Sequence, residues 1–100
     1  MNEVKQVLEG AIELIQDGWC QGTSSKTNKD GSMSYCMLGA MDRARFEKKL
    51  DTEFYYDART VVRDTMSTAI GSVNISAFND HPSTSKEDVI LMFKKAINGS

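Results

Sequence analysis

The sequence predicts a mainly α-helical fold, a compact bundle of about four helices with a short β-hairpin or an ordered loop between the first two. Apolar residues recur at three- and four-residue spacing in four separate segments, which is typical of helices with one buried side. A polar stretch at residues 21–34 interrupts this pattern once and contains the turn signal Asp30-Gly31. A chain of 100 residues is long enough for one hydrophobic core, so we expect residues 1–100 to form a single domain.

The first helix is predicted at residues 3–17, where apolar side chains occupy one side and charged side chains the other. Gly10 lies inside this helix, where glycine costs about 1 kcal/mol relative to alanine, so we expect another segment to approach closely there. Gly18 is expected to end the helix, because glycine readily takes the left-handed conformation of a helix C-terminus. The predicted buried side consists of Val4, Val7, Leu8, Ala11, Ile12, Leu14 and Ile15.

The polar stretch after this helix predicts a hairpin. Its turn is expected at Asn28–Gly31, and its arms near Cys20–Thr23 and Ser32–Tyr35. Small and apolar residues then resume a helical spacing, so a second helix is predicted to start within residues 35–37 and to end before Asp51.

A third helix is predicted at Glu53–Ile70, capped by Asp51-Thr52 and ended by Gly71. Residues 72–84 are predicted to be a connection, because Pro82 excludes a helix through that point.

The fourth helix is predicted to open with a capping box, in which the Thr84 hydroxyl and the Glu87 carboxylate bond each other's backbone amides. Val89, Ile90, Phe93 and their helical neighbours would form its buried side, and Gly99 would end it.

Charge and hydropathy exclude several classes of protein. The chain has 14 acidic and 12 basic residues, so we expect no nucleic-acid binding. Its apolar runs are only a few residues long, so we expect no membrane association. The N-terminus lacks the pattern of a secretory signal, and we therefore expect a cytoplasmic protein whose two cysteines stay reduced.

The stretch from Trp19 to Ala40 holds the only tryptophan and both cysteines of the chain. Cys36 near a predicted helix start has the position in which a thiolate is favoured, but a nucleophile also needs a base, and His81 is the only histidine. Cysteine more often fills space in a core, so we expect packing rather than catalysis. Zinc ligation by Cys20, Cys36, Asp80 and His81 is an alternative that the spacing does not favour, and we expect no metal or other cofactor.

Asn79-Asp80 precedes Pro82 and has the composition of a turn. An irregular segment such as the Trp19-Cys20 region needs partners for its backbone groups, so we expect Asn79 or Asp80 to reach back to that backbone. Binding of a ligand by these two side chains is the alternative. Tyr55-Tyr56 and Trp19 could also present an aromatic surface to a partner.

Four motifs stand at specific spacing: Trp19-Cys20, then Cys36-Met37-Leu38-Gly39-Ala40, then Phe78-Asn79-Asp80, then Thr84-Ser85-Lys86-Glu87. In these motifs the chain resembles a family of small uncharacterised proteins of bacteria and their phages, a domain of unknown function. Val89 follows one residue later than in the family pattern. The resemblance implies no activity, only that Trp19, Cys20, Cys36, Gly39, Asn79 and Asp80 recur as a set.

Short phage chains often act by binding a component of the host. We therefore expect a non-enzymatic binding protein, a small phage or mobile-element accessory protein that engages a host or anti-phage defence protein and can assemble as a homo-oligomer. The alternative is a pocket that holds a small nucleotide-like ligand or performs thiol chemistry. The candidate binding residues are Trp19, Cys20, Tyr35, Cys36, Asn79, Asp80 and His81.

Overall fold

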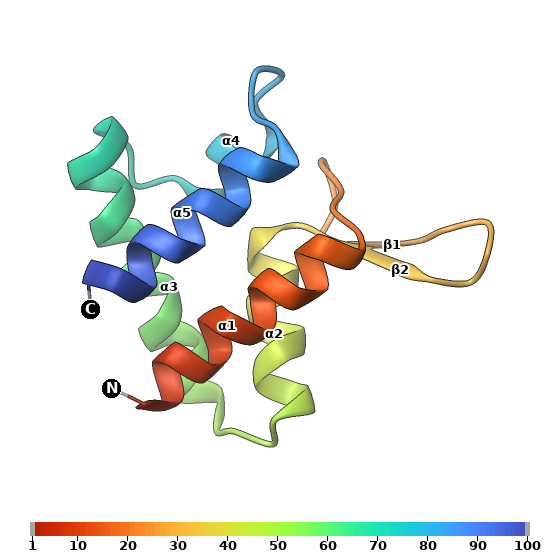
Figure 1. The fold of residues 1–100 in the computed structure, drawn as a ribbon, viewed down its shortest axis with the longest axis horizontal. Helices are drawn as coiled ribbons and strands as arrows, with labels where there is room; N and C mark the ends of the chain where they lie inside the picture. The colour runs from red at the N-terminus through yellow and green to blue at the C-terminus, as the bar shows by residue number, and fades with distance from the viewer. Residues whose placement is uncertain (1, 100) are drawn as a thin grey trace.

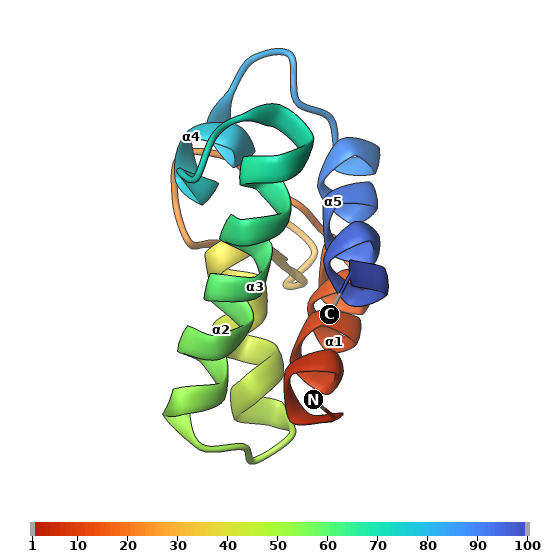
Figure 2. The same cartoon turned by 90° about the vertical axis from the view of Figure 1, so that its left-hand side faces the viewer.

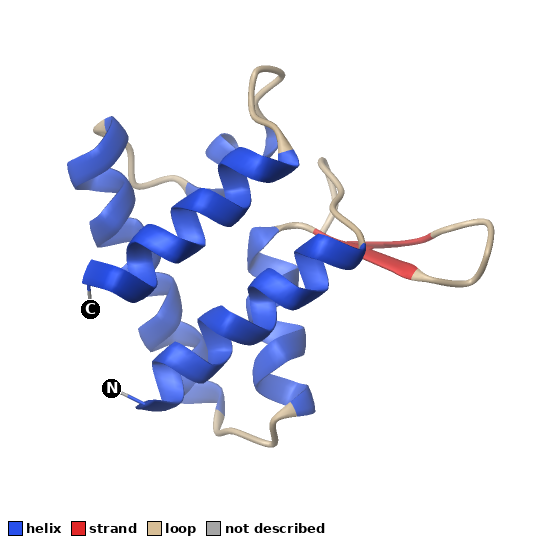
Figure 3. Cartoon of the chain, viewed as in Figure 1, coloured by secondary structure: helices blue, strands red, loops and turns tan. Residues whose placement is uncertain are grey.

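A computed structural model of the chain describes residues 2–99 and is mainly helical, as the sequence predicts (Figures 1 and 3). The molecule is flat, with extents of 36 × 33 × 17 Å. Seen from the side, α1 and α5 lie together, and α2 and α3 lie opposite them (Figure 2). The elements are α1 (Asn2–Asp17), β1 (Ser25–Thr27), β2 (Met33–Tyr35), α2 (Met37–Glu47), α3 (Thr52–Ile70), α4 (Ile75–Asp80) and α5 (Lys86–Gly99).

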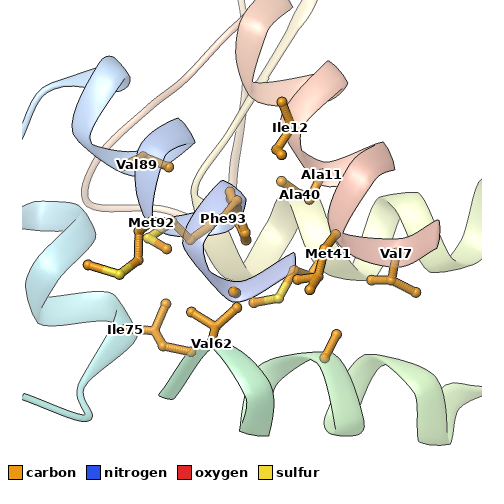
Figure 4. Close-up of a cluster of buried hydrophobic side chains, with 14 of the residues drawn as sticks. Val7, Ala11, Ile12, Ala40, Met41, Val62, Ile75, Val89, Met92 and Phe93 are labelled. Atoms are coloured by element: carbon orange, nitrogen blue, oxygen red, sulfur yellow. The ribbon is translucent and has the colours of Figure 1, made fainter. Parts of the chain in front are cut away.

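The core lies between these two pairs of helices, and α1 packs against all three others (Figure 4). Phe93 of α5 is completely buried at its centre, where a large apolar side chain contributes about 1.5–3 kcal/mol of transfer free energy. Gly10 allows α1 to cross α2 closely, because a Cβ there would lie 2.9 Å from the Cβ of Ala44. The predicted close approach at Gly10 is therefore confirmed.

The hairpin is present, but the predicted position of its first arm is wrong. β1 is Ser25–Thr27, not Cys20–Thr23, and it pairs with β2 in antiparallel register, Lys26 opposite Ser34. Residues 20–23 are irregular instead. The Cys20 amide bonds the Tyr35 carbonyl, but the Cys20 carbonyl and the Gly22 amide bond side chains at the end of α4, so no ladder continues here. The hairpin projects from the bundle (Figure 1).

The predicted connection at 72–84 is wrong in part, since it contains the short helix α4. Asn74 caps this helix by accepting a hydrogen bond from the Ala77 amide at 3.0 Å. The helix ends at Asp80, two residues before Pro82, which is consistent with the expected break.

Two predicted caps also differ. The capping box of α5 joins Ser85 and Asp88, each bonding the other's amide, rather than Thr84 and Glu87. Asp51 occupies the cap position of α3 but makes no side-chain cap hydrogen bond. Among residues 2–99, the helices are too short or too polar to cross a membrane.

Candidate functional site

The side chain of Asn79 joins three parts of the chain. Its Oδ1 accepts from Trp19 Nε1 at 2.8 Å and from the Met37 amide at 3.1 Å. Its Nδ2 donates to the Cys20 carbonyl at 3.1 Å and to Asp80 Oδ1 at 2.9 Å. Asn79 is 1% exposed, and its amide thus makes two bonds as acceptor and two as donor, the full capacity of its donor hydrogens. The predicted reach from Asn79 to the backbone at Cys20 is present.

The position of Asn79 follows from the pairing of the backbone around it. Trp19 and Tyr35 form an isolated parallel bridge, in which the Tyr35 amide bonds the Gly18 carbonyl and the Cys20 amide bonds the Tyr35 carbonyl. A longer parallel ladder would next bond the Met37 amide to the Cys20 carbonyl. The Asn79 carboxamide stands between these two groups and bonds both. The two backbone segments can therefore separate after Tyr35 while their polar groups stay hydrogen-bonded.

Further bonds fix the next residues to the end of α4. Gln21 Nε2 donates to the Asn79 carbonyl at 2.9 Å and to the His81 carbonyl at 3.1 Å. Asp80 Oδ1 accepts from the Gly22 amide at 2.9 Å. This bond, and secondarily the one from Asn79, lowers the pKa of Asp80 below its ordinary value. We call this contact between residues 19–22 and residues 79–81 the latch.

The two cysteines have different surroundings, and both are free. Cys36 is partly exposed at the N-cap of α2, where its Sγ accepts from the Gly39 amide at 3.4 Å. Cys20 is buried, and its thiol donates to the Thr23 carbonyl at 3.6 Å. Burial raises the pKa of Cys20, and a charge on the nearby Cys36 raises it further.

Gly39 is the point where the loop after the latch lies against α2. The Ser24 carbonyl accepts from the Cys36 amide at 3.1 Å. A Cβ at residue 39 would collide with that same carbonyl oxygen, whose carbon would be only 2.9 Å away. Glycine is therefore required here for the close approach of two backbones rather than for an unusual backbone angle.

An open cleft of about 520 Å³ lies next to the latch. It has the thiol of Cys36, two carboxylates and two tyrosine rings in its walls, and the residues that line it include no lysine, arginine or histidine. The lining comprises Gly22, Thr23 and Ser24 of the loop, Cys36 and its α2 neighbours Leu38, Gly39 and Asp42, Tyr55 and Tyr56 of α3, and Ile75, Ser76, Asn79 and Asp80 of α4.

The structure distributes the predicted binding residues over several places. Cys36, Asn79 and Asp80 line the cleft, whereas Trp19 and Cys20 do not line it and serve the latch. Tyr35 lines a neighbouring hollow. His81 is exposed outside the cleft, and its Nδ1 accepts from the Ser83 amide at 3.0 Å.

Asp42 of α2 was not among the binding residues predicted from the sequence, which at this helix included only its N-cap, Cys36. A carboxylate among the charges of a helix gives no signal that distinguishes it from an ordinary solvated residue. Tyr55 and Tyr56 were recognisable as an aromatic pair, and their rings pack edge to face at 5.0 Å, but Trp19 does not join them in the cleft.

Metal ligation by the cysteines and His81 is not supported by geometry. Within residues 2–99, the structure contains no group of three or more His, Cys, Asp or Glu side chains that could hold a metal ion.

These features define a small α-helical domain with an acidic and aromatic cleft beside a buried asparagine latch. The chain belongs to a family of unknown function, DUF6197, whose model matches residues 1–99. Membership in an uncharacterised family, which the motifs around Trp19, Cys36 and Asn79 predict, is confirmed. No curated protein and no solved structure matches the chain.

Proposed function

We propose that this protein is a non-enzymatic binding protein whose cleft receives a basic side chain from a protein partner. The observation that carries the proposal is the composition of the cleft, which combines Asp42, Asp80, Tyr55 and Tyr56 without a basic residue in its lining. Carboxylates attract an ammonium or guanidinium group. The two tyrosine rings, which already stack with Arg59 at 5.8 and 5.0 Å, add apolar surface for the stem of such a side chain.

Each carboxylate keeps one oxygen open to a ligand. Asp80 uses Oδ1 for the latch, and its Oδ2 has no hydrogen-bond partner within the described part of the chain. Asp42 uses Oδ1 for Arg45, at 3.1 Å, and its Oδ2 is similarly open. The latch therefore holds Asp80 in position while leaving its second oxygen without a hydrogen bond.

The rim of the cleft suits a protein better than an isolated small cation. Tyr56 at the cleft is 50% exposed, and Phe46 at the adjoining hollow is 60% exposed. Aromatic side chains are enriched among the residues that form protein interfaces. A nucleotide-like ligand is less well matched, because its phosphates would meet two carboxylates.

The resemblance to bacterial and phage proteins supports a partner from the host cell. We propose that the chain is a phage or mobile-element accessory protein and that the partner is a host or anti-phage defence protein in the cytoplasm. A second copy of the chain is an alternative partner, which would make the protein a homo-oligomer.

The test compares capture of cellular proteins by three forms of the tagged protein: the original, Tyr56→Ala and Leu91→Ala. Leu91 is a matched control, because it is 53% exposed on α5 and does not line the cleft. Loss of an aromatic interface residue typically weakens binding by about 1–2 kcal/mol, or roughly 5- to 30-fold. We expect a partner retained by Leu91→Ala and lost by Tyr56→Ala. Equal retention by both variants would refute binding at the cleft.

Thiol chemistry is the second candidate function, and the position of Cys36 in the cleft wall favours it. The nucleophile would need a base, and His81 lies outside the cleft, so only a carboxylate such as Asp42 or Asp80 is present there. A catalytic activity that disappears in Cys36→Ser, while binding of the partner persists, would favour this candidate.

A further inference from the structure

Another hollow, of about 390 Å³, adjoins the cleft and is lined by residues of α3 and of the start of α4. Its walls include Arg59 and Arg63, one helical turn apart on α3, and the hydroxyl-bearing Ser76 of α4. It shares Leu38, Ile75 and Ser76 with the cleft, but its lining contains no carboxylate. The two hollows therefore have opposite charge.

The arginines of the chain fall into two pairs. Arg43 and Arg45 bond carboxylates of their own helix, Glu47 and Asp42, each at 3.1 Å. Arg59 and Arg63 have no carboxylate partner within residues 2–99. The structure thus leaves one pair of guanidinium groups without a counter-ion.

The acidic residues of α3 form no ion pair with Arg59 or Arg63 in the described part of the chain. Asp57 and Asp64 lie roughly 140–160° around the helix from Arg59, at about 100° per residue. Asp64 accordingly lines a different hollow, beside Lys95 of α5. Like charges four residues apart on a helix repel each other, so Arg59 and Arg63 lie on one face of α3 despite their mutual repulsion.

Aromatic contacts hold Arg59 in place. Its Cζ lies 5.0 Å from the centre of the Tyr56 ring and 5.8 Å from that of the Tyr55 ring. A guanidinium stacked on a ring keeps its N–H edge free, and that edge matches two oxygens of one anion.

We propose that Arg59 and Arg63, with the Ser76 hydroxyl as a further donor, form a binding site for an oxyanion group, either a carboxylate or a phosphoryl group. The Ser76 hydroxyl has no hydrogen-bond partner in the described chain and lines the same hollow. This site stands on its own geometry and does not depend on the ligand of the cleft. Since the hollows adjoin, a single segment of a partner could place a basic group in one and an acidic group in the other.

The test is an NMR titration that follows the arginine Nε–Hε signals while inorganic phosphate, acetate or chloride is added at constant ionic strength. Arg43 and Arg45 serve as controls in the same spectrum, because their side chains already bond carboxylates. We expect saturable shifts at Arg59 and Arg63 with phosphate or acetate, and smaller shifts at the two controls. Phosphate binding tighter than acetate binding would identify the natural group as phosphoryl, and the reverse order would identify it as carboxylate.

Two variants complete the experiment. Arg63→Gln removes one guanidinium from an exposed position, and we expect at least a tenfold loss of anion affinity with an unchanged fold. Arg59→Lys keeps the charge but loses the planar guanidinium, and we expect the anion affinity to fall in this variant too. Shifts that are equal at all four arginines, that chloride reproduces, or that survive Arg63→Gln would overturn the site, whatever the result of the capture experiment at the cleft.

Discussion

The segment between α1 and α2 is polar throughout, yet its base and its tip are held in different ways. At the base, Trp19, Gln21 and Gly22 bond to residues 58 to 60 positions away in the sequence. At the tip, Asn28 bonds only to Ser32, Ser34 and its immediate neighbours, and the strand β1 is exposed along its whole length. The base is thus part of the folded core, while the tip is a local structure attached to it.

This difference shows what one buried asparagine can do in a small helical domain. Asn79 supplies hydrogen bonds that a parallel ladder would otherwise supply, and it brings the loop, α2 and α4 to the edge of the same cleft. The tip has no such link, and its own bonds close within seven residues of chain. Substitutions should therefore have large effects at the base and small effects at the tip.

The largest effect is expected for Asn79→Ala. The substitution leaves the Trp19 indole N–H, the Met37 amide and the Cys20 carbonyl without partners in a buried place, and each unsatisfied group costs about 1–3 kcal/mol. Some of these groups will regain water, so we expect a loss of about 3–4 kcal/mol in the free energy of unfolding. Urea denaturation followed by the fluorescence of Trp19 measures it. A loss below about 1 kcal/mol would mean that the latch is not part of the core.

Asn79→Asp is the matched control, because it keeps the shape of the side chain. An ionised carboxylate would turn an oxygen toward the Cys20 carbonyl and the Asp80 carboxylate, where Nδ2 donates in the original protein. Both neighbours disfavour the charge, so the pKa of the new carboxyl group should be raised in the folded state. Its destabilisation should be full at neutral pH and should shrink, relative to the original protein at the same pH, as acid protonates it.

The next effect concerns the two thiols, one of which belongs to the latch, Cys20, while the other, Cys36, caps α2. We expect iodoacetamide to label Cys36 at least about ten times faster than Cys20, since Cys20 is buried and burial raises its pKa, leaving less thiolate. Rates from intact mass, measured on Cys20→Ser and Cys36→Ser, separate the two sites. Rapid and equal labelling would show that the latch opens readily and that its base resembles the tip.

Much of the fold was predictable, because the buried side of each long helix repeats at helical spacing. The stripe from Val4 to Ile15 in α1 is one example, and α3, predicted at Glu53–Ile70 and observed at Thr52–Ile70, is another. α4 was not predictable in the same way. It is a six-residue helix with only Ile75 and Asn79 buried, too short to show a period.

The candidate site was predictable only where the chemistry of a segment requires a particular kind of partner. A buried partner for the Trp19-Cys20 backbone could be expected, and Asn79 supplies it. The cleft itself depends on how α3 faces α4 and on Gly39 meeting the Ser24 carbonyl, and contacts across such distances leave no local pattern in a sequence. Asp42 lines the cleft only because of this packing of distant segments.

The smallest effect is expected at the tip. Replacing residues 27–33 by Asn-Gly would connect Lys26 to Ser34, its partner in the hairpin, through a two-residue turn. The Asn28 amide bonds the Ser32 carbonyl at 2.7 Å, and bonded pairs alternate along an antiparallel ladder, so Lys26 and Ser34 are a bonded pair suited to a two-residue turn.

This shortened protein should differ from the original by about 1 kcal/mol or less in the free energy of unfolding. The change removes the bond from Asn28 Nδ2 to Ser34 Oγ at 3.0 Å, while the shorter loop is easier to close. The Trp19 fluorescence of the folded state should stay the same, because the bond from its indole to Asn79 lies outside the replaced residues. If the shortened hairpin cost as much as Asn79→Ala, the tip would be as much a part of the core as the base, and the contrast between them would be lost.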